Sequence, residues 1–323
     1  MTETEIKKTT IVFMGTPDIA SIVLESLHLE NYPILGVVTQ PDYKLKNKDE
    51  DEYISPVKKL ALEKNIPIYQ PQKLDDDFKK WLKNLSPDLI IVTAFGKIIP
   101  RDILEIPKFK SLNVHASLLP KLRGASPIQN ALANGMNETG ITIMLMDEGI
   151  DTGDILSQKS IIIDPQDDYI TLTGKLAVAA SSLILKTIPS WIDGSLAPTK
   201  QDSNGATMCQ LIEKSDGKIN WDEDAQDIYN KFRAFRVWPG IFTFWENKNN
   251  LQKLSLNQII VEKDKLGEKH HLGEVFKYSE NEVGVQTNSG VIILEKIQLA
   301  GKNETPVNDF LNGYPDFIGS ILK

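Results

Sequence analysis

The chain has 323 residues, of which 41% are hydrophobic and 25% are charged, values typical of a globular protein of about two domains. A formal net charge of −8 and an isoelectric point near 5.2 exclude a protein whose whole surface is basic enough to follow nucleic acid, although they leave room for one basic face. The sequence has no uninterrupted apolar run near the roughly 20 residues of a membrane helix, and Met1 to Thr10 lacks the apolar core of a signal peptide. Cys209 is the only cysteine, so we expect a cytoplasmic protein without internal disulfides.

The first part of the chain alternates between predicted strands and helices. An apolar run over Thr10 to Met14 predicts a strand, Asp18 is typical of a cap before a helix over Ile19 to Leu27, and Ile34 to Thr39 predicts the next strand. This order indicates a βαβ unit, so we expect an α/β, Rossmann-like domain with a mainly parallel sheet. Because the first turn holds a single glycine, the G-x-G-x-x-G fingerprint is absent and no nicotinamide or flavin cofactor is supported. Further predicted helices cover Ser55 to Lys64, Asp75 to Leu85, Ile128 to Ala133 and Tyr169 to Trp191, and further predicted strands cover Ile66 to Tyr69, Leu89 to Thr93, Ser111 to Val114, Thr139 to Met146 and Ile155 to Ile163.

The last third of the chain has a different pattern. Gly, Ser, Pro and Asn cluster between Asp193 and Asn204, as is typical of a linker. After a predicted helix over Ala225 to Phe235, five short apolar runs separated by polar turns indicate a small β-barrel of the oligonucleotide-binding (OB) type. We therefore predict a first domain over residues 1–205, with the linker from about 193, and a barrel domain over 206–323. The five runs are Ile241 to Phe244, Leu254 to Val261, Gly273 to Phe276, Val283 to Thr287 and Val291 to Leu299.

Asn113 and His115 are the first candidates for catalysis. They are two residues apart on a predicted strand, so they point to the same side, near the carboxyl end where α/β sheets place their chemistry. An imidazole can take a proton from an attacking amine, and an amide can donate to a developing oxyanion. Asp151, in a turn rich in glycine and carboxylates, can orient the imidazole. A lone histidine at a strand end is more often structural, but these neighbours favour catalysis without a covalent intermediate, because Ser117 has no obvious second base.

Three other polar clusters could have no role in function. The carboxylates from Asp147 to Asp154 lack the spacing of a calcium loop, and His270 and His271 lack further ligands at metal spacing, so no metal is expected. The charged loop from Tyr43 to Tyr53 is either a solvated loop or a segment that orders on a partner.

Several of these stretches together resemble the folate-dependent formyltransferases, and within them the branch that acts on methionyl-tRNA. The resemblance covers nearly the whole chain, and the Trp-Pro-Gly stretch and the C-terminal domain narrow it to that branch. It rests on Phe13-Met14-Gly15-Thr16-Pro17-Asp18, Thr39-Gln40-Pro41-Asp42, Ser55-Pro56-Val57-Lys58, Asn113-Val114-His115-Ala116-Ser117-Leu118-Leu119-Pro120, Arg123-Gly124, Asp151-Thr152-Gly153-Asp154, and Arg233-Ala234-Phe235 followed by Trp238-Pro239-Gly240.

The resemblance implies a formyl donor, 10-formyltetrahydrofolate, and an acceptor, the α-amine of methionine on initiator tRNA. Asn113, His115 and Asp151 match the family's catalytic positions. The predicted folate contacts are Phe95, Gly96, Ile98, Ser117, Leu118, Leu119 and Pro120, and the predicted tRNA contacts are Lys44, Lys46, Lys48 and Arg123. We expect a monomer. An amino-sugar N-formyltransferase, a hydrolase of the formyl-folate and a non-catalytic tRNA-binding relative are the alternatives.

Overall fold

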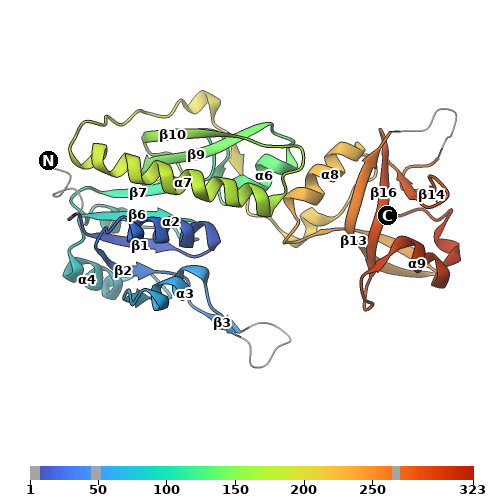
Figure 1. Cartoon of the computed structure of the whole chain (residues 1–323), viewed down its shortest axis with the longest axis horizontal. Coiled ribbons are helices and arrows are strands. Elements are labelled where there is room, and N and C mark those ends of the chain that lie inside the picture. Colours follow the sequence, from blue (N-terminus) through green and yellow to red (C-terminus); the bar gives the residue numbers. More distant parts are fainter. Residues whose placement is uncertain (1–7, 45–51, 264–269) are drawn as a thin grey trace. The chain divides into compact units, whose positions relative to one another are not determined.

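A seven-stranded sheet in the order β10-β9-β7-β6-β1-β2-β5 organises the first unit of the chain (Figure 1). Five neighbouring strands are parallel, and β9 and β10 add an antiparallel edge. The inner strands read as apolar runs because helices cover both of their faces. The bounds are β1 (Ile11–Gly15), β2 (Ile34–Val38), β5 (Ile68–Tyr69), β6 (Leu89–Thr93), β7 (Ser111–His115), β9 (Glu138–Leu145) and β10 (Ile155–Ile162).

The strand order reverses between β1 and β6. From β1 the chain moves outward through β2 to β5, and then returns to place β6 and β7 on the other side of β1. Open α/β sheets bind ligands outside the carboxyl ends of their strands at such a reversal. His115 is the last residue of β7, next to β6, so the sequence-predicted residues lie at this part of the sheet.

Helices cover the two faces of the sheet. On one face, Phe78 and Leu82 of α4 and Ile103 of α5 pack against Val12 and Ile90. On the other face α2 contacts β1, β6 and α3, and the Ser181 hydroxyl of α7 donates to a carbonyl of α2. The helices are α2 (Asp18–Leu29), α3 (Pro56–Glu63), α4 (Asp76–Leu85), α5 (Arg101–Leu104), α6 (Pro127–Ala133) and α7 (Tyr169–Ile192).

Side chains cap the N-termini of α3 and α4 but not that of α2. Asp75 caps α4 as the side-chain acceptor for the Phe78 N–H, and Ser55 caps α3 in the same way. The prediction that Asp18 caps α2 is wrong, because α2 begins at Asp18 and its N-cap residue is Pro17. Asp18 instead lies in the first turn, where a negative charge is favoured by the helix dipole.

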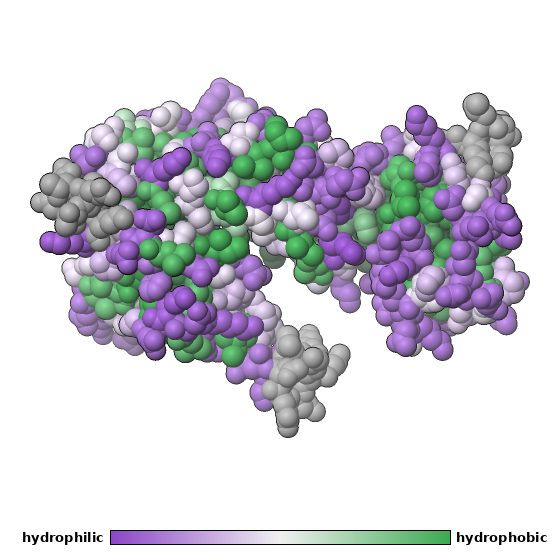
Figure 2. All heavy atoms as spheres, viewed as in Figure 1, coloured by the Kyte–Doolittle hydropathy of each residue, from purple (hydrophilic) through white to green (hydrophobic). Residues whose placement is uncertain are grey.

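Helix α7 is long and apolar enough to cross a membrane by length and composition alone, which a search for uninterrupted apolar runs misses. In the structure one of its faces is buried, with Leu176, Ala180 and Ile184 fully covered. The Thr187 hydroxyl lies 2.6 Å from that of Ser157 in β10, so α7 packs on the sheet as a core helix does. Figure 2 shows hydrophobic and hydrophilic residues interspersed over the visible face of the molecule.

The segment predicted as a linker and the residues just after it are bound to the first unit. Thr199 forms a bridge with Ile155, and β11 (Met208–Cys209) pairs in parallel with β8 (Arg123–Gly124), which follows the loop after β7. A short helix, η1 (Ser203–Gly205), lies between these two attachments. The segment therefore contributes to the region around His115.

The second unit is built on antiparallel strands in the order β12-β13-β16-β15-β14, with β17 on β16. The five predicted strands are present, and the fold class of an α/β domain followed by a strand-rich domain is confirmed. Trp245 packs edge-on against Phe310, Tyr314 and Phe317 in the core of this unit. Its elements are η2 (Lys214–Gly217), α8 (Ala225–Ala234), β12 (Ile241–Asn247), β13 (Asn250–Glu262), β14 (Val275–Lys277), β15 (Val283–Gln286), β16 (Val291–Leu299), β17 (Thr305–Pro306), α9 (Val307–Gly313) and η3 (Pro315–Phe317).

This computed structural model describes residues 8–44, 52–263 and 270–323. The first unit extends to Pro127 and adds Asn137–Ile163 and Thr171–Gln210, while the second unit comprises Ile128–Met136, Asp164–Ile170 and Leu211–Lys323. A small hairpin of β3 (Tyr43–Lys44) and β4 (Glu52–Tyr53) belongs to the first unit.

Candidate active site

Strand β7 fixes the first two candidate residues. Asn113 pairs with Val92 on one neighbouring strand and with Met144 on the other, and His115 pairs with Thr142. The side chains of Asn113 and His115 share one side of β7 because strand side chains alternate, and both residues are buried. The sheet thus holds an amide and an imidazole rigidly at the carboxyl end of a central strand.

The turn between β9 and β10 supplies the carboxylate. The Asp147 carboxylate organises this turn by accepting from the Gly149 N–H at 3.0 Å and from the Thr152 hydroxyl at 2.7 Å. At Gly153 a Cβ atom would lie 1.8 Å from the Leu145 carbonyl oxygen, so only glycine lets the turn pass this close to β9. Asp151 has a left-handed backbone with a φ of +53°, which aims its side chain back toward β7.

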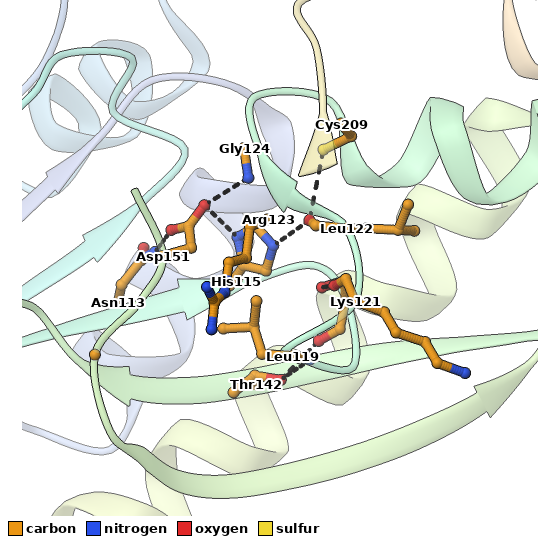
Figure 3. Close-up of polar contacts among 12 residues, drawn as sticks. Asn113, His115, Leu119, Lys121, Leu122, Arg123, Gly124, Thr142, Asp151 and Cys209 are labelled. Carbon is orange, nitrogen blue, oxygen red and sulfur yellow. Dashed lines mark hydrogen bonds and ion pairs between the residues drawn. The ribbon is translucent and has the colours of Figure 1, made fainter. Parts of the chain in front are cut away.

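The three side chains converge, as Figure 3 shows. Asn113 Nδ2 donates to Asp151 Oδ1 at 3.2 Å, and Asp151 Oδ2 lies 3.6 Å from His115 Nδ1. The Gly124 N–H also donates to Asp151 Oδ2, at 2.8 Å. Two residues far apart in sequence from Asp151 therefore meet its carboxylate, and a backbone N–H holds it in place.

The hydrogen-bond partner of the other ring nitrogen, Nε2, shows which tautomer His115 adopts. His115 Nε2 lies 2.9 Å from the Leu122 carbonyl oxygen, and a carbonyl only accepts, so Nε2 carries the hydrogen. In the neutral ring Nδ1 is then the nitrogen with a lone pair, which makes it the atom that can take up a proton. Once it does, each ring N–H faces an acceptor, Leu122 O on one side and Asp151 Oδ2 on the other. The surroundings are thus arranged for a ring that gains and returns one proton.

The loop after β7 is held by the antiparallel edge of the sheet. The Thr142 hydroxyl donates to Ser117 O at 2.7 Å and accepts from Leu119 N at 3.1 Å, and Gln158 Nε2 donates to Leu119 O at 2.8 Å. The Ser117 hydroxyl donates to Lys121 O at 2.6 Å. The polar groups of Ser117 and Leu119 are therefore occupied within the protein, which leaves Leu118 and Pro120 with their apolar surfaces as the remaining predicted folate contacts on this loop.

The loop after β6 provides the other predicted folate contacts. Phe95 is buried, and its carbonyl accepts from the Gln40 side chain at 2.8 Å. Gly96 has a left-handed backbone, with a φ of +83°, and Ile98 is an apolar side chain left 79% exposed. Between them Lys97 donates to the carbonyls of Pro71 and Gln72, and burial lowers the pKa of its amine.

The residues predicted to contact tRNA lie in two settings. Lys44 ends β3, whose Tyr43 ring stacks on Tyr53 of β4 with ring centroids 4.8 Å apart. Lys46 and Lys48 lie outside the described residues. Arg123 is buried, and its Nε and Nη2 both donate to Gln201 Oε1, at 3.1 and 2.8 Å.

Sequence reasoning missed the groups that hold the three side chains in place. Two of them are backbone groups, the Leu122 carbonyl and the Gly124 N–H, and such groups have no sequence signature of their own. Leu122 has a φ of +56°, which is uncommon for leucine and unpredictable from its sequence. Cys209 also donates to the Leu122 carbonyl, with its sulfur 3.5 Å away, and burial raises the pKa of this thiol. Among the described residues no group of three or more His, Cys, Asp or Glu side chains could hold a metal ion.

Comparisons with known proteins agree over both units. A family model described as "Formyl transferase" matches residues 7–188, and one described as "Formyl transferase, C-terminal domain" matches residues 211–315. The chain is 44% identical over 316 residues to the methionyl-tRNA formyltransferase of Caldicellulosiruptor saccharolyticus, which covers 97% of this chain and 99% of that protein.

Two solved structures are similar in fold. One is the sugar 3N-formyl transferase WlaRD, determined in the presence of dTDP and 5-N-formyl-THF, with a TM-score of 0.62 and 25% identity over 91% of this chain and 99% of that one. The other is HypX from Aquifex aeolicus in complex with tetrahydrofolic acid, with a TM-score of 0.64 and 15% identity over 95% of this chain. The match spans about half of HypX, 48% of its length.

Proposed function

This chain belongs to the formyl transferase family, and we propose that it transfers a formyl group from 10-formyltetrahydrofolate to the α-amine of methionine carried by initiator tRNA. The observation that carries the proposal is the convergence of Asn113, His115 and Asp151 at the carboxyl end of β7. A relative also supports the proposal, because a methionyl-tRNA formyltransferase of 44% identity aligns with 97% of the chain.

The site suits a folate of this kind. When bound, a 10-formyl folate supplies a formyl carbon that an amine can attack. Ile98, Leu118 and Pro120 place apolar side chains on the two loops that follow β6 and β7, as a flat heterocycle requires. Two proteins of similar fold were determined with a tetrahydrofolate or a formyl-THF present.

The three side chains divide the chemistry between them. The Asn113 amide donates to the formyl oxygen as negative charge develops there, which lowers the barrier to attack. His115 Nδ1 accepts the proton that the attacking amine loses and returns it to the leaving nitrogen. Asp151 stabilises the protonated ring and fixes its orientation, and the Gly124 N–H holds Asp151 against the same ring. The acceptor brings its own nucleophile, so no serine or cysteine of the chain needs to form a covalent intermediate.

We propose that both domains of the chain bind the tRNA. We divide the chain into a formyltransferase domain over residues 1–205 and an OB-like domain over residues 206–323 that contributes to tRNA binding. Lys44, Lys46 and Lys48 contact phosphates next to the acceptor end. The enzyme is a cytoplasmic monomer that works without a metal.

A second candidate function is formyl transfer to an amino sugar. The fold of this chain matches 99% of the sugar 3N-formyl transferase WlaRD, so an amino-sugar nucleotide is the competing acceptor. The same Asn, His and Asp chemistry would serve either amine.

The test offers the purified chain a donor labelled on its formyl carbon together with one of three acceptors: methionyl initiator tRNA, an amino-sugar nucleotide or water alone. Label on the methionine amine at a kcat/KM at least 100-fold above that for the sugar supports the proposal. Faster labelling of the sugar, or release of labelled formate at the same rate without any amine, would reject it.

A further inference from the structure

We infer that Gln201 is a positioning residue that holds Asp151 in its catalytic orientation, an inference that rests on the proposed function because it takes Asp151 as part of the reaction. Gln201 lies in the segment whose composition is typical of a linker, outside every motif of the sequence analysis. Its side chain nevertheless contacts both Arg123 of β8 and the turn that carries Asp151.

The side-chain amide of Gln201 is hydrogen-bonded through both its nitrogen and its oxygen. Its Nε2 donates to the Asp151 carbonyl at 2.9 Å and to the Gly153 carbonyl at 2.7 Å. Its Oε1 accepts from Nε and Nη2 of Arg123. The partners fix which way the amide points, because guanidinium groups only donate and carbonyls only accept. Glutamine is the side chain of this length that offers two donors and an acceptor at its end.

Asp151 is the part of the site that needs external support. Its left-handed backbone is strained for a residue with a side chain and persists only where surrounding contacts hold it. Gln201 bonds to the carbonyl of Asp151 itself and to that of Gly153, two residues later, so it holds the stretch from which the catalytic carboxylate projects. The 3.6 Å separation between Asp151 and His115 depends on this stretch.

Gln201 is itself fixed in space. Thr199 exchanges two backbone hydrogen bonds with Ile155, at 2.8 and 2.9 Å, just before it. Further on, the Thr207 N–H donates to the Pro120 carbonyl, and the Leu122 N–H donates to the Thr207 hydroxyl. The segment that carries Gln201 is therefore fastened to the turn that bears Asp151 and to the loop that bears the Leu122 carbonyl.

A narrower role would be that Gln201 only gives buried Arg123 an acceptor. The two roles separate in Gln201→Glu, which keeps an acceptor for Arg123 and loses both donors to the Asp151 turn. Gln201→Met removes both ends while it keeps the side-chain length. If positioning Asp151 is what matters, both variants lose turnover, whereas an acceptor for Arg123 alone would leave Gln201→Glu active.

The experiment measures kcat and both KM values for formyl transfer to methionyl-tRNA in the full chain, its two Gln201 variants and a matched control. The control is Gln298→Leu, which also removes a hydrogen bond from a glutamine amide to a backbone carbonyl, that of Lys302 in the second unit. Thermal melting of each protein reports whether it folds. A displacement of a catalytic group by about 1 Å costs on the order of 100-fold in rate, so we expect kcat to fall about 10- to 100-fold in both Gln201 variants.

We expect the KM values to change less than about threefold, because the Gln201 amide is bound at both ends to groups of the protein itself, and the control to match the unmodified chain. A folded Gln201→Glu variant with more than half of the normal kcat would overturn the inference, and so would a rise in KM at unchanged kcat. If the unmodified chain does not formylate methionyl-tRNA at all, the proposed function fails instead, so the two failures are distinguishable.

Discussion

Replacing Asp151 by Asn removes the charge of the catalytic carboxylate. The substitution keeps the size of the side chain and an oxygen that can accept from the Gly124 N–H, while its amino group takes the place of the oxygen that accepts from Asn113 Nδ2. It removes the negative charge that faces His115 Nδ1 at 3.6 Å, and this charge matters only when the ring is protonated. The side chains of His115 and Asp151 are 6% and 15% exposed, so solvent screens this interaction only in part.

The size of the effect follows from that distance. Two unit charges 3.6 Å apart interact by about 4 to 5 kcal/mol at an effective dielectric constant of about 20. Each 1.36 kcal/mol is about tenfold in rate, so Asp151→Asn should lower the rate of formyl transfer about 1,000-fold.

The assay is single-turnover formyl transfer with saturating donor and methionyl-tRNA, read as label on methionine. Glu148→Gln serves as the control, because it makes the same chemical change on the same turn at a carboxylate that is 66% exposed and pairs with Arg101 at the surface. The control should keep its rate within about twofold, since such pairs contribute little. An Asp151→Asn variant with more than a tenth of the normal rate would refute the assigned role of the carboxylate.

Three further predictions concern the tRNA loop, the β8–β11 pair and acid stability. Replacing Lys44, Lys46 and Lys48 by Ala should raise the KM for tRNA and flatten its dependence on salt, because fewer counterions are released; an unchanged salt slope would show that the loop does not contact phosphate. Gly124→Ala should destabilise the protein by about 2 kcal/mol in urea unfolding, because its Cβ would lie 2.2 Å from the Cys209 carbonyl oxygen at a φ of +116°, and an unchanged unfolding midpoint would contradict the packing described. Burial acts to raise the pKa of Asp42, but hydrogen bonds from Lys58 and Gln70 and the charge of Lys58 hold it below its ordinary value of 3.8. The stability that Asp42 contributes is therefore present above that value and lost as the pH falls below it, so Asp42→Asn should lower Tm more near pH 7 than near pH 3, and an equal loss at both would contradict this.

Much of the fold was predictable because the inner strands are buried on both faces. Apolar runs such as Leu89 to Thr93 mark the sheet, and the alternation of helices between them indicates parallel connections. The motifs around Asn113 and Asp151 likewise predicted the family, which is confirmed by the family models over residues 7–188 and 211–315. That Asn113 and His115 share one side of β7 followed from their spacing alone.

The support of the site was not predictable from local pattern. The Leu122 carbonyl and the Gly124 N–H act through the backbone, and the conformations that aim them depend on contacts made by residues 85 positions later, Thr207 for Leu122 and Cys209 for Gly124. Composition between Asp193 and Asn204 indicated a linker, yet Gln201 within it bonds to the Asp151 turn. A polar segment can bind to a folded unit through hydrogen bonds, and composition does not distinguish such a segment from a free one.

The role of His115 as the proton shuttle is tested most directly by His115→Ala in a single-turnover reaction with labelled donor and methionyl initiator tRNA. Thermal melting and donor binding show beforehand that the variant folds and binds the folate. We predict that the unmodified chain places the label on the methionine amine and that His115→Ala, though folded and able to bind the donor, places essentially none there. Labelling by the variant at a near-normal rate would contradict the mechanism.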